Sequence, residues 1–331
     1  MLLRWAAAAI GPTAEILGVR GLNNGQRPWQ VTIRDGSGIV EAVLRDVVLG
    51  WIDEAAIATG AAALRVAEDH GLPAPRLIAS DLNGARTDGV AVTLETALPG
   101  SSALPPQVST RRLNEAGAAI ARVHAIPLQP QQHLPLRTRP TQIDDRARER
   151  RWSTLYAATE EANRPAVLNA LRELTGWPES QALAVLTAPY STPLLQLADD
   201  RIRDYDRPRT PSVFLHGDIW GGNMLWDGDN CLALIDWKTA GAGNPGVDLG
   251  ELRLQMALQY GPEAAQHVLA GWEYQSGRQA TDTPYWDIVA ALNTPVILDG
   301  WPGFDTDGGV LPVTAVTGRR DEFLSAALNQ L

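Results

Sequence analysis

The stretch between Val213 and Arg253 constrains this chain more than any other part of its sequence. It contains the string HGDIWGGN, which places Asn223 five residues after Asp218. An apolar pair follows, then the string DGDN and a second apolar run that ends at Asp236. Turn-forming residues between two apolar runs predict a β-hairpin. If the runs pair, Asn223 and Asp236 are brought side by side, and Asp218 lies on the loop just before them.

These three side chains suit phosphoryl transfer, in which a protein mostly positions groups and neutralises charge. The carboxylate of Asp218 can accept a hydrogen bond from a hydroxyl and orient it towards a γ-phosphate. The amide oxygen of Asn223 and the carboxylate of Asp236 are hard oxygen ligands that suit Mg²⁺. The spacing H-x-D-x-x-x-x-N matches the kinase catalytic loop. We therefore take Asp218 as the catalytic carboxylate and Asn223 and Asp236 as the metal ligands. The alternative is a purely structural role for all three.

HGDIWGGN, followed by LIDW and GNPGVDL, resembles the aminoglycoside phosphotransferase and choline kinase-like family of small-molecule kinases. The resemblance implies an α+β, two-lobed protein-kinase-like fold. A small antiparallel sheet lobe at 1–97 would bind the nucleotide, and a larger, mostly helical lobe at 98–331 would carry the catalytic loop and the acceptor. It also implies ATP or GTP as cosubstrate, Mg²⁺ as cofactor, and a bracing role for Asp248.

The first hundred residues have the pattern of that sheet. We expect an Ala-rich helix at 53–70 and strands at 15–20, 29–33, 38–45, 76–78 and 90–98. The loop at 21–28 contains Asn24 and Gly25, residue types that tolerate a left-handed backbone. The resemblance makes this loop the cover of the nucleotide phosphates. It also makes the backbone around Glu95 and Ala97 the hinge that binds adenine.

The kinase pattern ends the third strand with a lysine, but Lys238 is the only lysine among the 28 basic residues of this chain. Arg45 occupies the strand position, and a guanidinium can bind phosphate oxygens in bidentate fashion. An exposed arginine on an edge strand is the alternative. The resemblance also predicts a glutamate near residue 60, where this chain has Gly60. Either Glu54 substitutes or the ion pair is absent, so a nucleotide-binding pseudokinase without transfer activity is a rival hypothesis.

Beyond Pro99 the periodicity becomes helical. Leu113, Ala116, Ile120 and His124 recur every three or four residues and predict one buried helix face. On that face His124 is expected to be a hydrogen-bonded core histidine. Two further helices are expected, one from Asp248 to Gly261 and one that starts at Pro262.

Composition and charge narrow the class of partner. A hydrophobic content of 45% and a charged content of 20% are typical of a soluble globular protein. No apolar stretch approaches the ~20 residues of a membrane span. Gly11 and Pro12 end the apolar start too soon for a signal peptide, so we expect a cytoplasmic protein. The net charge of −10 argues against nucleic acid, and the single cysteine excludes an internal disulfide.

The acceptor is expected to be a hydroxylated small molecule, and the acidic charge permits a cationic one. The resemblance favours an aminoglycoside or another antibiotic, and therefore a role in antibiotic resistance. Asp299, Asp305 and Asp307 could receive its amines, although solvated surface acids are the alternative. A metabolite kinase acting on a ketosamine, an amino acid or choline is the runner-up with the same chemistry.

Overall fold

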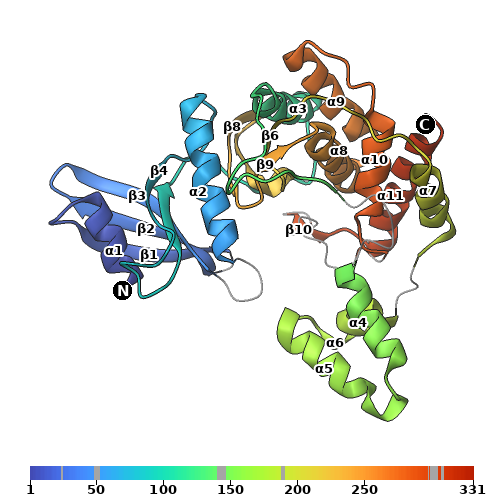
Figure 1. Cartoon of the computed structure of the whole chain (residues 1–331), viewed down its shortest axis with the longest axis horizontal. Helices are drawn as coiled ribbons and strands as arrows, with labels where there is room; N and C mark the ends of the chain where they lie inside the picture. The colour runs from blue at the N-terminus through green and yellow to red at the C-terminus, as the bar shows by residue number, and fades with distance from the viewer. Residues whose placement is uncertain are drawn as a thin grey trace. The chain divides into compact units, whose positions relative to one another are not determined.

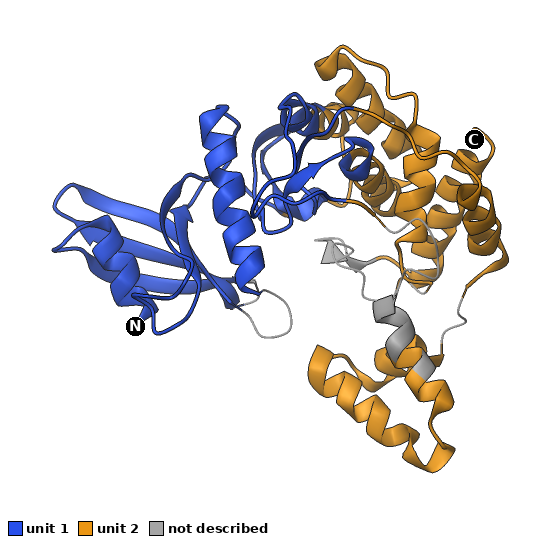
Figure 2. Cartoon of the chain, in the orientation of Figure 1, with its two compact units in different colours: residues 1–102, 118–137, 211–248 blue, residues 103–117, 138–210, 249–331 orange. Residues whose placement is uncertain are grey.

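The computed structural model describes residues 1–23, 25–47, 53–139, 147–187, 191–296, 298, 305–306 and 309–331. The chain forms two compact units, and each is assembled from three separate stretches (Figure 2). Unit 1 contains 1–102, 118–137 and 211–248, and unit 2 contains 103–117, 138–210 and 249–331. A five-stranded antiparallel sheet combined with many helices confirms the expected α+β class. The lobe boundary at residue 97 stays a prediction.

The sheet of unit 1 has the strand order β1-β2-β3-β5-β4 (Figure 1). Its strands are β1 (Glu15–Asn23), β2 (Gln26–Asp35), β3 (Gly38–Asp46), β4 (Leu77–Asp81) and β5 (Val92–Thr96). Val31 and Ile33 on β2 are fully buried and cluster with Leu44 and Leu94 from β3 and β5. This alternation is the period-two pattern of a strand with one face in the core. It places Arg45, the residue after Leu44, on the opposite face of β3.

The hairpin of β1 and β2 is tighter than the sequence suggested. The predicted loop at 21–28 is mostly strand, because β1 continues to Asn23 and β2 begins at Gln26, directly opposite it. Gly25 lies in the remaining connection with φ +79°, the left-handed region expected for it. Asn24 lies outside the described residues.

Two helices accompany the sheet. α1 (Leu2–Ile10), which the sequence did not predict, contributes Trp5 and Ala6 to the core beneath β2 and β3. α2 (Glu54–Asp69) matches the predicted Ala-rich helix. The side chain of Asp53 accepts a hydrogen bond from the Ala56 amide at 2.8 Å and so caps its N-terminus.

The catalytic-loop region of unit 1 is built from two short strand pairs. β6 (Val213–Leu215) pairs with β9 (Gly241–Gly243), and β7 (Met224–Asp227) pairs with β8 (Asn230–Leu234). The second pair is the predicted hairpin. The loop that carries Asp218 therefore leaves β6 and returns to β7, and Asp236 follows the end of β8.

Helices dominate unit 2. They include α4 (Ala147–Ala158), α5 (Arg164–Thr175), α6 (Glu179–Thr187), α7 (Pro193–Arg203), α9 (Pro262–Ser276), α10 (Thr283–Leu292) and α11 (Val313–Leu328). α3 (Thr110–His124) and α8 (Gly246–Tyr260) contribute residues to both units, and β10 (Asp305–Thr306) pairs with β11 (Gly309–Val310). The predicted buried face of α3 is confirmed, since Leu113, Ala116, Ile120 and His124 are all buried. Within the described part of the chain, no helix has the length and apolarity to cross a membrane.

A buried ion pair ties three helices of unit 2 together. Arg253 on α8 bonds Asp287 on α10 through Nε and Nη2, at 2.9 and 2.8 Å. Its Nη1 donates to the Ala265 carbonyl on α9 at 2.6 Å. Burial raises the pKa of Asp287, although Arg253 opposes that shift.

Asp287→Ala is expected to cost about 3–5 kcal/mol of unfolding free energy, because it leaves the Arg253 guanidinium buried without its partner. Denaturant titration of the folded protein measures this loss. Glu179→Ala is the matched control, since Glu179 pairs with Arg172 on the surface and should cost less than about 1 kcal/mol. Equal losses for the two variants would contradict the account.

Candidate active site

One buried carboxylate fixes the start of the catalytic loop. Asp248, in the first turn of α8, accepts the backbone amides of His216 and Gly217 at 2.7 and 2.9 Å. His124 Nε2 lies 3.3 Å from the same carboxylate, so the histidine predicted to be a core residue is hydrogen-bonded there. Burial alone would raise the pKa of Asp248, but these donors outweigh it and hold the pKa below its ordinary value. The predicted bracing role of Asp248 is confirmed.

The loop's first two residues leave little freedom to its backbone. The His216 Nε2 lies 2.9 Å from the Ile235 carbonyl, and burial lowers the pKa of this ring, which favours its neutral form. Gly217 has φ +82°, and a Cβ there would lie 2.1 Å from the Thr239 carbonyl oxygen. Only glycine fits this position, and Asp218 follows directly from it.

The hairpin brings the three predicted residues together. Asn223 accepts the Ile235 amide on its carbonyl at 3.0 Å, which sets Asp236 beside it, and its side-chain Nδ2 donates to the Asp218 carbonyl at 2.7 Å. Asp236 has φ +67°, an uncommon conformation outside glycine that marks functional sites. The Asp218 side chain is 42% exposed, so its carboxylate is accessible to a hydroxyl.

The donor set fits Mg²⁺. Nδ2 of Asn223 is used by the loop, which leaves its Oδ1 as the oxygen donor for an ion. The Asp236 oxygens each contact a cation, Arg45 or Lys238, and each has a further lone pair for an ion. Among the residues that the structure describes, no group of three or more His, Cys, Asp or Glu side chains could hold a metal. Two protein oxygens suit an ion that takes its other ligands from water and nucleotide phosphates.

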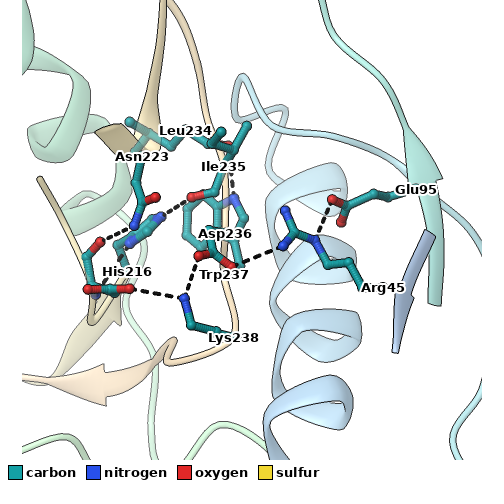
Figure 3. A network of polar contacts seen from close by, with 10 residues as sticks. Arg45, Glu95, His216, Asn223, Leu234, Ile235, Asp236, Trp237 and Lys238 are labelled. Carbon is teal, nitrogen blue, oxygen red and sulfur yellow. Dashed lines mark hydrogen bonds and ion pairs between the residues drawn. The ribbon is translucent and has the colours of Figure 1, made fainter. Parts of the chain in front are cut away.

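Arg45 lies at this site rather than on the surface. Its Nε donates to Glu95 Oε1 at 2.7 Å, and its Nη1 lies 3.2 Å from Asp236 Oδ1 (Figure 3). Burial would lower the pKa of Arg45, but the two carboxylates raise it above its ordinary value. The acid that pairs with the strand cation therefore comes from β5. Glu54, in the first turn of α2, is exposed.

The adenine hinge stays a prediction, although Glu95 and Ala97 make other contacts in this structure. β5 is flanked by β3 and β4, and Glu95 lies opposite Val43 on one and Leu77 on the other. Its backbone is therefore inside the sheet, and its side chain accepts a hydrogen bond from Arg45. The Ala97 amide donates to the Glu41 carbonyl at 3.0 Å, which leaves the Ala97 carbonyl for the predicted adenine contact. The alternating pattern predicted strand β5, but it did not predict which strands would pair with β5 on either side.

Lys238 is the site residue that the sequence-based predictions missed. Its Nζ lies 3.1 Å from Asp218 Oδ2 and also donates to Asp236 Oδ2 (Figure 3). Burial would lower the pKa of Lys238 and raise that of Asp236, but their mutual attraction, with Asp218 and Arg45, shifts each the other way. A signal was present in the sequence, since the only lysine of the chain comes two residues after Asp236.

The predicted acceptor acids cannot be placed. Asp299 and Asp307 lie outside the described residues, and only the backbone of Asp305, in β10, is described. Their role stays a prediction.

Asp248→Asn tests the brace through its pH dependence. The folded pKa of Asp248 lies below its ordinary value of 3.8, so its stabilisation is present above that pH and is lost as the pH falls through the folded pKa. We expect the variant to be about 2–4 kcal/mol less stable at neutral pH, with a difference that shrinks below about pH 4. Denaturant titrations at several pH values measure the difference. Asp227→Asn, at the exposed end of β7, is the control. A pH-independent difference for Asp248→Asn would contradict the brace.

The comparisons agree with this geometry. The sequence profile of the phosphotransferase enzyme family matches residues 18–287. No curated protein sequence matches the chain. Among solved structures, macrolide 2'-phosphotransferase MphH from Brachybacterium faecium is similar over 100% of this chain and 97% of its own, with 17% identity and a TM-score of 0.54.

Two further structures hold ligands. A thermostable mutant of aminoglycoside phosphotransferase APH(4)-Ia, in a ternary complex with AMP-PNP and hygromycin B, is similar over 96% of this chain and 95% of its own, with 14% identity and a TM-score of 0.52. Amicoumacin kinase hAmiN, in complex with AMP-PNP, Ca²⁺ and Ami, is similar over 93% and 88%, with 10% identity and a TM-score of 0.53. At these identities the likeness shows the shared fold. The match over residues 18–287 places the chain in the phosphotransferase enzyme family, as a small-molecule phosphotransferase.

Proposed function

We propose that this protein transfers the γ-phosphoryl group of ATP or GTP to a hydroxyl of an antibiotic of the aminoglycoside type. The observation that carries the proposal is that the braced loop after β6 and the β7–β8 hairpin bring Asp218, Asn223 and Asp236 together. Proteins of similar fold include a macrolide 2'-phosphotransferase, an aminoglycoside phosphotransferase in complex with hygromycin B and an amicoumacin kinase, which supports an antibiotic as acceptor. The net charge of −10 is compatible with an acceptor that carries amines.

In this reaction the acceptor oxygen bonds to the γ-phosphorus while the bond from that phosphorus to the β–γ bridging oxygen breaks. The electron pair leaves with the nucleoside diphosphate, and the hydroxyl proton passes to the Asp218 carboxylate. Asp218 orients the hydroxyl for in-line attack. Mg²⁺, held by Asn223 and Asp236, would supply charge neutralisation at the phosphates when bound.

Arg45 is proposed to bind the nucleotide phosphates. Glu95 holds the guanidinium group of Arg45 against Asp236, so a cation of fixed orientation lies next to the proposed metal ligand. Arg45 on β3 and Glu95 on the neighbouring β5 would supply the strand cation and its acid, which favours a transferring enzyme over a pseudokinase. Gly25, Ala97 and Asn24 remain proposed nucleotide contacts, Ala97 through its carbonyl.

Asp218→Ala is expected to lower acceptor-dependent turnover by more than about a hundredfold, because the general base is lost. A coupled ADP- or GDP-release assay with Mg²⁺ measures it, against aminoglycosides, other hydroxylated antibiotics, ketosamines, amino acids and choline. Asp229→Ala, in the β7–β8 turn, is the control and should keep wild-type turnover. A productive ketosamine or choline, with all antibiotics inactive, would replace the proposed acceptor but keep the reaction.

Arg45→Met is expected to raise the KM for the nucleotide about ten- to a hundredfold, because the variant loses one or two charge-assisted hydrogen bonds to the phosphates. The acceptor KM should change little. Steady-state kinetics with each substrate varied in turn measure the split. Arg65→Met removes the same charge from the exposed side of α2 and serves as the control. An unchanged nucleotide KM in Arg45→Met would remove Arg45 from the phosphate site.

A further inference from the structure

Lys238 occupies a position that the proposed reaction does not yet use. Its ammonium contacts the carboxylates of both Asp218 and Asp236, and its side chain is 26% exposed. In Figure 3 it extends from the segment after β8 towards Asp236, on the other side of that residue from Arg45. The family resemblance assigns no role to a cation at this point of the sequence.

The two contacts locate the ammonium relative to the reaction. Asp218 is the group proposed to hold the attacking hydroxyl, and Asp236 is the group proposed to hold Mg²⁺ at the β- and γ-phosphates. The transferring phosphoryl group must pass between the hydroxyl and the leaving oxygen, which are roughly in line. A donor within hydrogen-bond distance of both carboxylates therefore lies beside the path of that phosphoryl group.

The chemistry of lysine suits this position. Its ammonium has three donors on a flexible stem, so it can keep a carboxylate and still donate to a phosphoryl oxygen. Arg45 is oriented by Glu95, which has no part in the proposed reaction, whereas Lys238 contacts the two carboxylates of that reaction, Asp218 and Asp236. Gly60 of α2 lies next to Lys238, because a Cβ there would be 3.9 Å from the Lys238 backbone, an ordinary contact distance. The glycine at the position where the resemblance predicts a glutamate thus keeps a third carboxylate away from this ammonium.

We propose that Lys238 is a catalytic residue whose ammonium donates a hydrogen bond to a non-bridging oxygen of the γ-phosphoryl group during transfer. The inference rests on the proposed phosphotransfer. Lys238 and Arg45 would neutralise the charge that spreads over the phosphoryl oxygens in the transition state, and Mg²⁺ would supply further neutralisation when bound. Lys238 stays protonated throughout, since Asp218 takes the hydroxyl proton.

The rival interpretation is that Lys238 is only a counter-ion, which fills the gap between two carboxylates and is displaced when Mg²⁺ binds. The two interpretations predict opposite effects on binding. A counter-ion competes with the metal, so its removal would tighten Mg·ADP binding. A residue that contacts the phosphoryl group mainly stabilises the transition state, so its removal weakens a transition-state mimic far more than Mg·ADP.

The experiment measures the affinity for Mg·ADP with and without aluminium fluoride, a mimic of the transferring phosphoryl group, by calorimetry. Wild type, Lys238→Met, Lys238→Arg and the control Arg65→Met are compared. For wild type and the control, fluoride is expected to tighten ADP binding by about a hundredfold or more. We call this increase in ADP affinity the fluoride gain. Lys238→Met should lose most of the fluoride gain, while its Mg·ADP affinity without fluoride stays within about threefold of wild type. Lys238→Arg, which keeps a cation, should retain part of the gain.

Turnover gives a second readout, in which kcat of Lys238→Met should fall by about 10²–10³-fold with little change in the acceptor KM. A Lys238→Met variant that binds Mg·ADP more tightly and keeps the full fluoride gain would overturn the inference and establish the counter-ion. Wild type with neither a fluoride gain nor a phosphorylated acceptor would instead overturn the proposed function. If Lys238→Met does not fold, a full fluoride gain in Lys238→Gln would overturn the inference in the same way.

Discussion

The hydrogen bonds from two backbone amides to the buried carboxylate of Asp248 are the interactions on which the site depends. They fix the backbone of His216 and Gly217, from which Asp218 projects. An uncompensated carboxylate would be expensive at full burial, and the amides together with His124 offset that cost. Asp248 also belongs to the first turn of α8, where the helix dipole favours a negative charge. The catalytic loop is therefore anchored to a helix and not to its own flanking strands alone.

The second constraint is the balance of charge around Asp236. Arg45 contacts one oxygen of this carboxylate and Lys238 the other, which keeps it ionised despite its burial. Arg45 is itself oriented by Glu95 from the neighbouring strand. The adjacent strands β3 and β5 thus carry both Arg45 and the acid that pairs with it. The resemblance predicted that this acid would be a glutamate on a helix. Because Glu95 on the sheet orients Arg45, α2 does not need a glutamate for that purpose. The residue of α2 next to Lys238 is Gly60.

Local sequence signals predicted most of this arrangement. The turn residues at 227–230 and their flanking apolar runs predicted the β7–β8 hairpin, and its register alone brings Asn223 next to Asp236. The sheet order and the neighbours of β5 were not predictable, because they depend on pairings between residues far apart in the sequence. For that reason Glu95 was assigned a backbone role, whereas its side chain is what serves the site. α1 was missed because its apolar run is short and ends at glycine and proline. Lys238 stands out in the sequence as the only lysine. Its contact with Asp218 could not be predicted, because it depends on how the loop between β6 and β7 packs against the segment after β8.

The central claim is that Asp218, Asn223 and Asp236 act together to move a phosphoryl group onto a small molecule. Mass spectrometry of the acceptor panel, after incubation with the protein, Mg²⁺ and ATP or GTP, tests it most directly. The account predicts an acceptor that gains one phosphoryl group and a matching amount of nucleoside diphosphate. Nucleoside diphosphate without any phosphorylated acceptor, or nucleotide binding without either product, would contradict it.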